Sequence, residues 1–433
     1  MKSESGPAAG QEDFTEEVAR GFDRADPLGD FRDQFHLPLK ADGTPWIYFV
    51  GNSLGAMPKR ARTIVTQELD DWASLGVEGH FHGTRPWFSY HEFFREQGAR
   101  LVGARPGEVV MMNSLTVNLH LMLATFYQPV SGRSIIAMED CAFPSDAYAV
   151  ESHIQHRGFD PETSTLIFRP RPGEALLRTE DVEDLIERRG KEIAVLLLSG
   201  VNYYTGQLFD LPRLARAAKR QGCVVGFDLA HAAGNVELSL HDWDVDFAVW
   251  CSYKYLNAGP GAVAGCFVHE RHGTNRELPR LAGWWGNDPE QRFLMHVNEH
   301  FEPRPGADGW QISNPPILSL APLHASRELF EKAGMPALRS KSIALTGYLE
   351  SLIGQLGGNR IEIISPADPA ARGCQLSLRI RDGSRDVFDR IQAAGVLCDY
   401  RHPDVIRVAP VPFYNTFHEV WRFARILSQV TAH

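Results

Sequence analysis

The sequence predicts an α/β protein with a large domain, whose mainly parallel sheet is covered by helices, and a smaller α+β domain at the C-terminus. Short apolar segments alternate with helical segments as far as about residue 315. These segments are apolar throughout, as expected for parallel strands that are buried on both faces. Beyond residue 315 helices precede the strands instead, and the 433 residues are enough for two cores.

The elements of the large domain are predicted in chain order. The turn-rich sequence GNSLGAMP at 51–58 precedes a helix over 59–75, where apolar residues recur at helical spacing. Buried strands are expected at 109–112, 135–138, 165–168, 193–198, 223–228, 247–251 and 264–268. Helices between them are expected at 115–126, 179–189 and 211–221.

The C-terminal part has a different order of elements. It is expected to contain helices over 317–333, 336–355 and 417–430, and strands over 361–364, 375–380 and 405–409. We therefore expect three parts: residues 1–50 as a leader and a segment that packs with the small domain, 51–314 as the large cofactor-binding domain, and 315–433 as the small domain. The first dozen residues are polar and are expected to be disordered.

Composition excludes several classes of partner. With 44 basic and 54 acidic residues the net charge is -10, which argues against nucleic acid or an anionic membrane as a partner. The longest apolar run, 193–198, is far too short for a bilayer, which needs about 20 residues. Residues 1–14 lack the apolar core of a signal peptide. Six scattered cysteines without a CxxC pair predict reduced thiols and a cytoplasmic protein.

The strongest motif is Ser252-Tyr253-Lys254, directly after the predicted strand 247–251. A lysine at the end of a buried strand is unfavourable unless it is paired or uncharged. A Schiff base with an aldehyde removes that charge and uses the amine as a nucleophile. Asp228 ends another strand 26 residues earlier, at the sheet edge where ligands of α/β proteins collect.

This lysine and aspartate together favour pyridoxal 5'-phosphate (PLP) as a cofactor. PLP needs an acid against its pyridine nitrogen, so that the ring stays protonated and accepts electrons. Asp228 suits that role, with His231 three residues further on. Taken singly, each is better interpreted as an ordinary strand-end aspartate or a surface lysine. The pair, with its strands and spacing, favours the cofactor.

Two further segments are candidates for the rest of a cofactor site. Phosphate binds at helix N-termini and hydroxyls, and NSLT at 113–116 begins a predicted helix with the amides of Leu115 and Thr116. A plain helix N-cap is the alternative. FPSD, from Phe143 to Asp146, offers an aromatic ring and a carboxylate, although a loop with an incidental phenylalanine explains it equally well. Tyr253 would add a phenolic donor.

Two arginines near the C-terminus are candidates for binding a substrate carboxylate. Arg401 and Arg407 bracket a His-Pro-Asp segment, and a planar guanidinium suits an amino-acid carboxylate. Arg407 lies in a predicted strand and is less easily explained as a surface residue, but the choice between the two stays open.

Two other motifs are rejected. The sequence GPGAVA at 259–264 matches a dinucleotide-binding pattern, but Pro260 removes a backbone donor and a strand follows where a helix is required. His80 and His82 lack a carboxylate or cysteine at ligand spacing, so no metal is expected.

Over residues 26–418 the chain resembles the kynureninase family. FDLAHAAGN (227–235), CSYKYLNAGPG (251–261) and RVAPVPFYN (407–415) are close to family-specific. Supporting segments are GNSLG (51–55), GHFHGTRPW (79–87), NSLTVNLH (113–120), FPSD (143–146), YYTGQ (203–207), GWWG (283–286) and QISNPP (311–316). Trp285 departs mildly from the pattern, where another aromatic residue is expected.

The resemblance implies a PLP-dependent transferase fold of type I and a homodimer with shared active sites. Lys254 would carry the Schiff base and move the α-proton, while Tyr253 would act as an acid. Asp228 would bind the pyridine nitrogen. The other implied cofactor contacts are Leu115, Thr116, Phe143, Asp146, Ser199, His231, Tyr253 and, from the neighbouring subunit, Trp284 and Asn314. The implied substrate contacts are Arg407 for the carboxylate and His80, Ser313 and Asn314 for the aryl end.

The implied reaction is hydrolytic cleavage of L-kynurenine or 3-hydroxy-L-kynurenine to L-alanine and anthranilate or 3-hydroxyanthranilate. Its place in tryptophan catabolism, NAD biosynthesis or secondary metabolism stays open. A cysteine desulfurase or aminotransferase would use the same lysine and aspartate, but Cys374 and Cys398 lie in or next to predicted strands, whereas desulfurases need a mobile cysteine. A protein that binds PLP or an aromatic amino acid without turnover is the remaining alternative.

Overall fold

The structure is a computed structural model, and it describes residues 14–297, 300–356 and 360–432. The predicted disordered leader lies outside these ranges. Within them, no helix combines the length and the apolar character that crossing a membrane requires.

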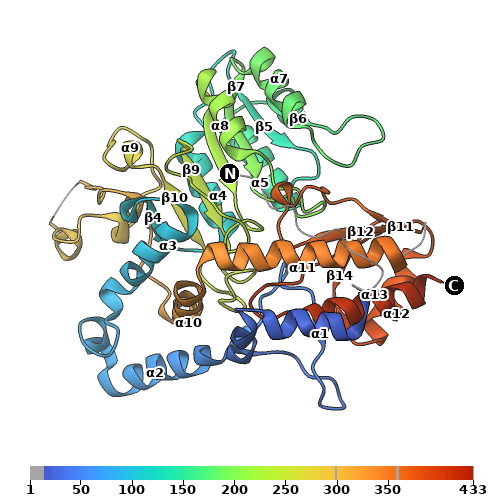
Figure 1. Cartoon of the computed structure of the whole chain (residues 1–433). Coiled ribbons are helices and arrows are strands. Elements are labelled where there is room, and N and C mark those ends of the chain that lie inside the picture. Colours follow the sequence, from blue (N-terminus) through green and yellow to red (C-terminus); the bar gives the residue numbers. More distant parts are fainter. Residues whose placement is uncertain (1–13, 298–299, 357–359, 433) are drawn as a thin grey trace, which may run out of the picture.

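A seven-stranded sheet occupies the centre of the larger part of the molecule (Figure 1). Its order is β4-β10-β9-β8-β7-β5-β6, and five neighbouring strands, from β9 to β6, run parallel. The strands are β4 (Val109–Met111), β5 (Ile135–Glu139), β6 (Thr165–Phe168), β7 (Ile193–Ser199), β8 (Val224–Asp228), β9 (Phe247–Trp250) and β10 (Gly265–Val268). The predicted, mainly parallel sheet is therefore confirmed.

Strand β10 is antiparallel to both of its neighbours, β9 and β4. A parallel neighbour needs a crossover connection of a dozen or more residues that is usually helical. The loop from β9 to β10 contains no helix, because it is rich in glycine and carries Pro260. The chain therefore turns back, and the last strand of the large sheet runs in the opposite direction.

Helices cover the sheet on two faces, each with its own core. Helices α4 (Leu115–Phe126) and α5 (Pro144–His156) pack on one face, while α7 (Thr179–Arg189) and α8 (Leu211–Arg220) pack on the other. Successive side chains of a strand point to opposite faces. In β5, Ile135 and Ala137 belong to the core under α7 and α8, and Ile136 and Met138 to the core under α4 and α5.

The C-terminal part has a second sheet and a third core. Its four strands are antiparallel in the order β11 (Ile361–Ile363), β12 (Leu376–Ile380), β15 (Val405–Val408) and β14 (Asp399–Arg401). Helices α11 (Met335–Leu356), α12 (Ser384–Ala393) and α13 (Phe417–Thr431) contribute to its core, which contains Leu349, Leu378, Ile406 and Phe423. The predicted smaller α+β unit is therefore present.

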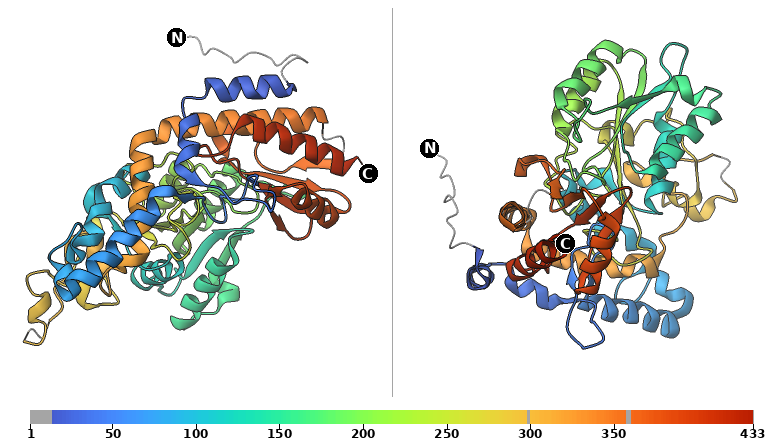
Figure 2. Two further views of the ribbon diagram at one scale, coloured as in Figure 1. Left: turned by 90° about the horizontal axis from the view of Figure 1, so that it is seen from below. Right: turned by 90° about the vertical axis from the view of Figure 1, so that its right-hand side faces the viewer.

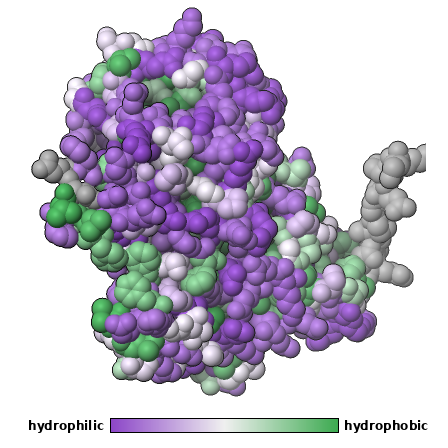
Figure 3. Space-filling view, turned by 90° about the vertical axis from the view of Figure 1, so that its left-hand side faces the viewer, coloured by the Kyte–Doolittle hydropathy of each residue, from purple (hydrophilic) through white to green (hydrophobic). Residues whose placement is uncertain are grey.

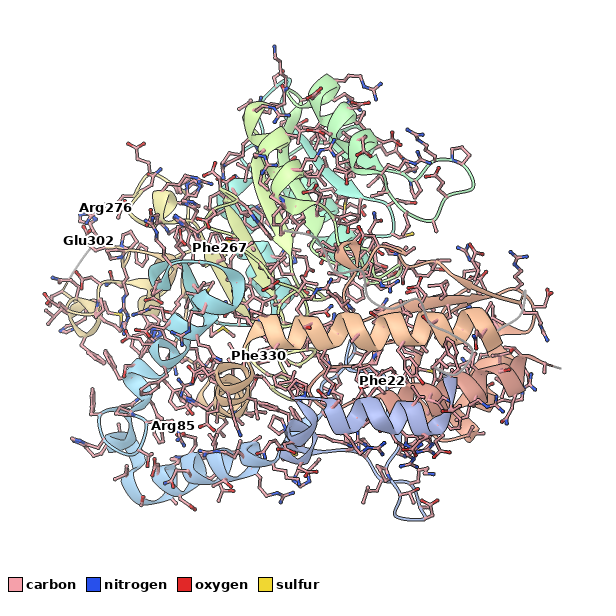
Figure 4. All side chains as sticks on the ribbon, viewed as in Figure 1. Phe22, Arg85, Phe267, Arg276, Glu302 and Phe330 are labelled. Atoms are coloured by element: carbon pink, nitrogen blue, oxygen red, sulfur yellow. The ribbon has the colours of Figure 1, made fainter. Side chains whose placement is uncertain are left out.

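The N-terminal segment lies against this smaller part. Helix α1 (Glu16–Ala25) runs beside α11 and α13 (Figure 2). Phe22, labelled in Figure 4, meets Tyr348 of α11 edge-on at 5.5 Å between ring centroids and Phe417 of α13 at 5.4 Å. The Asp23 carboxylate accepts hydrogen bonds from the backbone amides at the start of α13. The domain limits at residues 51 and 315 stay predictions.

Gly265→Ala is expected to destabilise the large sheet. An added methyl at this position in β10 would overlap the buried Trp250 indole of β9. Overpacking of this kind costs about 1–3 kcal/mol, measured as the free energy of unfolding in urea. Gly347→Ala in α11 is the control, because its methyl meets nothing within 4 Å and helix propensity then adds about 0.5–1 kcal/mol. Equal stability of the two variants would contradict this packing.

Candidate active site

A cavity lies at the carboxyl ends of the parallel strands. Ser199 ends β7, Asp228 ends β8, and Lys254 follows β9, so the sheet brings these three residues to one edge. The cavity is lined by Leu115, Thr116, Phe143, Asp146, Ser199, Val201, Tyr203, Asp228, Ala230, His231, Tyr253 and Lys254. Nine of the eleven predicted cofactor contacts are among these lining residues. The two that are missing are Trp284 and Asn314.

The amine of Lys254 lies 3.0 Å from Nε2 of His231. His231 is buried, and burial together with the positive charge of Lys254 lowers the pKa of His231 well below its usual value. The imidazole is therefore neutral and accepts a hydrogen bond from the amine at Nε2. The Lys254 amine also lies 5.8 Å from the centroid of the Phe143 ring.

Two buried carboxyl groups lie beside each other in the cavity. Burial raises the pKa of Asp228, and burial and the neighbouring Asp228 raise the pKa of Asp146 well above its usual value. Asp228 accepts a hydrogen bond from the Ala230 amide at 2.7 Å, whereas Oδ1 of Asp146 has no hydrogen-bond partner among the described residues. Both carboxyls would ionise more easily beside a bound cationic group.

Glu139 is a third buried carboxyl group, which the sequence did not predict. It ends β5 and accepts hydrogen bonds from the hydroxyl and the amide of Ser199. Burial raises its pKa to about 7. The sequence position of Glu139 could have indicated a place in the site, because Glu139 ends a buried strand, as Ser199 and Asp228 do.

Two helix N-termini meet at the same cavity. Helix α4 begins after Ser114 and α5 after Phe143, and neither N-cap side chain accepts a hydrogen bond from its helix. The hydroxyls of Thr116 and Ser145, one in each first turn, lie 3.2 Å apart. The amides in the first turn of α4, together with the hydroxyls of Thr116 and Ser145, favour an anionic group such as phosphate.

These features fit PLP. The helix N-termini suit its phosphate, the buried carboxyl of Asp228 suits a protonated ring nitrogen, and the Lys254 amine suits its aldehyde. Phe143 offers an aromatic face beside that amine. Oδ1 of Asp146 and Nδ1 of His231 have no hydrogen-bond partner within the described ranges, which marks the cavity as a place where a polar group belongs.

Arg401 and Arg407 come from the smaller sheet; neither lines the cavity itself, but both contact Tyr203, which does. Each guanidinium lies 5.8 Å from the centroid of the Tyr203 ring, which lines the cavity and meets Phe143 edge-on at 5.4 Å. Arg407 donates to the backbone oxygen of Tyr203 at 2.6 Å. The sequence identified both arginines but gave Tyr203 no role.

Four further predicted contacts do not line this cavity either: His80, Ser313 and Asn314 for the substrate, and Trp284 for the cofactor. His80 ends the 3-10 helix Gly76–His80, with its ring edge-on to Trp87 at 5.5 Å. Trp284 begins the 3-10 helix Trp284–Gly286, and Ser313 and Asn314 are exposed. The structure therefore separates these four residues from the Lys254 cavity within one chain.

A buried carboxylate holds the segment that follows His80. Glu68 of α2 (Lys59–Leu75) accepts hydrogen bonds from Arg85 at 2.6 Å, Trp87 at 3.0 Å and Tyr90 at 2.9 Å. Arg85, labelled in Figure 4, lies beside α2. Because Trp87 contacts the His80 ring, this anchor fixes the position of His80.

Known structures share the fold at low sequence identity. The cysteine desulfurase CsdA of Escherichia coli matches with a TM-score of 0.76 and 17% identity, over 94% of this chain and 98% of that one. A C-DES mutant with glycine covalently linked to its PLP cofactor matches with a TM-score of 0.74 and 18% identity, over 92% and 98%. The predicted type I fold is confirmed.

Sequence relatives are much closer. The kynureninase of Koribacter versatilis is 56% identical over 96% of this chain and 98% of its own length. That of Myxococcus xanthus is 54% identical over 95% and 96%. The kynureninase C-terminal domain model matches residues 338–427. With a family-specific C-terminal domain and relatives aligned over nearly its whole length, the chain belongs to the kynureninase family.

Proposed function

We propose that the chain is a PLP-dependent hydrolase that cleaves the β,γ carbon–carbon bond of L-kynurenine or 3-hydroxy-L-kynurenine. The products are L-alanine and anthranilate or 3-hydroxyanthranilate. The observation that carries the proposal is the cavity joining Lys254, Asp228 and two helix N-termini, in a chain of the kynureninase family.

The burial and the raised pKa of the cysteine thiols argue against a desulfurase activity. Cys374 and Cys398 are buried, and burial raises the pKa of both, to about 12 for Cys374. Cys141 is exposed, but partial desolvation and the nearby Asp140 and Glu139 raise its pKa as well. A reactive thiol needs the opposite environment, one that stabilises the thiolate.

The residues of the cavity supply the remaining chemistry. Bound PLP supplies an electron-accepting ring that stabilises negative charge at the α-carbon of an attached amino acid. Lys254 moves the α-proton, and the neutral His231 orients its amine at 3.0 Å. Asp228 keeps the ring nitrogen protonated. Burial raises the pKa of Tyr253, so its phenol stays protonated, as the acid role implied by the family resemblance requires.

The active enzyme is a homodimer in this proposal. His80, Trp284, Ser313 and Asn314 lie outside the Lys254 cavity, so they serve the site of the other subunit. Large apolar residues of the segments around His80 and Trp284 are exposed: Phe81 (55% exposed), Leu281 (58%), Phe293 (56%) and Val297 (65%). Figure 3, which views the molecule from the left of Figure 1, shows apolar residues (green) gathered in its lower left part. Apolar exposure of this kind marks an interaction surface, and two-fold dimers are the commonest assembly.

The cytoplasm is the proposed location. All six cysteines are unpaired, and all but Cys141 are buried. Unpaired thiols in a chain of this size are typical of a reducing compartment.

Wild-type protein with PLP is expected to release fluorescent anthranilate from L-kynurenine, and Lys254→Ala is expected to abolish this. The variant should also lose the visible absorbance of the bound cofactor, because the amine that attaches the cofactor is missing. The exposed Lys191→Ala serves as control and should keep both signals. A Lys254→Ala protein that stayed yellow after dialysis, with borohydride labelling another peptide, would refute the assignment.

Asp228→Asn is expected to lower kcat by about 10²–10⁴-fold, the range for loss of a group that controls a proton. Its stability should not fall, because burial already disfavours the Asp228 carboxylate. The measurements are kcat, exchange of the α-proton of L-alanine in D2O, and the melting temperature. A lower melting temperature with unchanged proton exchange would indicate a structural aspartate instead.

Mixed dimers test the shared site. Lys254→Ala chains and Trp284→Ala/Asn314→Ala chains are each expected to be inactive or weak alone. Refolded together in equal amounts, they should regain about a quarter of wild-type activity, because half of the dimers are mixed and each holds one intact site. Light scattering should give twice the chain mass of 48.4 kDa. An active monomer, or no recovery on mixing, would disprove the shared site.

A further inference from the structure

We propose that Arg401 is a substrate-binding residue, which takes the α-carboxylate of the amino-acid substrate together with Arg407. The inference deepens the proposed function and rests on it in one respect, that the substrate carries an α-carboxylate. It follows from the hydrogen bonds, the charges and the position of the two arginines.

Arg407 is already bound by the protein on most sides. Its side chain is 1% exposed, and its Nε donates to Oδ1 of Asp399 at 2.6 Å. One terminal nitrogen donates to the other oxygen of Asp399, and the other nitrogen to the backbone oxygen of Tyr203 at 2.6 Å. A guanidinium has five N–H donors, so few of those on Arg407 remain for a ligand.

Arg401 has donors to spare. Its side chain is 37% exposed, and its one hydrogen bond among the described residues is a long one, 3.5 Å to Oδ2 of Asp399. Its Nε is enclosed and has no partner within the described part of the chain. An enclosed N–H without a partner is unfavourable and is satisfied when an oxygen of a ligand arrives.

The charges at this place are unbalanced. Two guanidinium groups share one carboxylate, that of Asp399, which also accepts a hydrogen bond from Ser53 at 2.8 Å. Burial and the neighbouring Arg407 lower the pKa of Arg401. Lys254, which lines the cavity, adds positive charge. A second carboxylate would balance the pair of arginines, and an α-carboxylate supplies one.

The position of Arg401 allows this contact. Its guanidinium packs over the Tyr203 ring, as that of Arg407 does, and this ring lines the cavity that holds Lys254. Asp399 and Tyr203 thus hold Arg407 as a fixed cation, while the more exposed Arg401 is free to exchange its long contact for a substrate oxygen.

The experiment compares Arg401→Gln and Arg401→Lys with wild-type holoenzyme. Inhibition constants are measured for L-alanine, which carries the α-carboxylate, and for 2-aminoacetophenone, which carries the aryl ketone without it. Arg401→Gln should weaken L-alanine about 10- to 100-fold, as expected for a charged hydrogen bond, and leave 2-aminoacetophenone unchanged. KM for kynurenine should rise with kcat less affected, and Arg401→Lys should recover part of the loss.

Arg390→Gln is the matched control, because Arg390 lies in the same part of the molecule and is 36% exposed in a pair with Asp386. It should change neither inhibition constant. Unchanged L-alanine inhibition in Arg401→Gln would overturn the inference, as would equal weakening of both inhibitors. The wild-type assay for anthranilate is independent of these variants, so a failure of the proposed function is distinguished from a failure of Arg401.

Discussion

The burial of charge at one edge of the large sheet is the constraint on which the rest of the site depends. Parallel strands bring Glu139, Ser199 and Asp228 to their common carboxyl ends, and Asp146 joins them from α5. Burial raises the pKa of all three carboxyl groups. Such a group is stable only with hydrogen bonds or an opposite charge. In the proposed holoenzyme, Lys254 and the protonated ring nitrogen of PLP would supply that charge.

The second constraint is the junction between the two sheets. Ser365, Ser377 and Arg407 of the smaller part donate to the backbone oxygens of Thr205, Tyr204 and Tyr203 in turn. Three successive carbonyl groups of one turn are thus held by the other sheet. Arg407 and the cavity wall at Tyr203 therefore have a fixed relative position, set by hydrogen bonds to backbone oxygens rather than to the Tyr203 side chain.

The sequence predicted the strands of the large sheet and the pair Lys254 and Asp228, because both depend on local patterns: apolar runs and charged residues at strand ends. It did not predict the antiparallel direction of β10, which depends on a loop connection rather than on the strand. Tyr203 was missed because its role comes from two arginines about 200 residues away. Long-range contacts of this kind leave no signal at either position in a single sequence.

The position of His80 bears on whether two chains share an active site. Sequence likeness assigned it to the substrate, yet within one chain it lies outside the Lys254 cavity, fixed through Trp87 by the buried Glu68. A role for His80 at the substrate would therefore need the cavity of another chain beside it. The anchor in α2 and the exposed aromatic and aliphatic residues beside it agree with the proposed homodimer, in which each subunit would form a wall of its neighbour's active site.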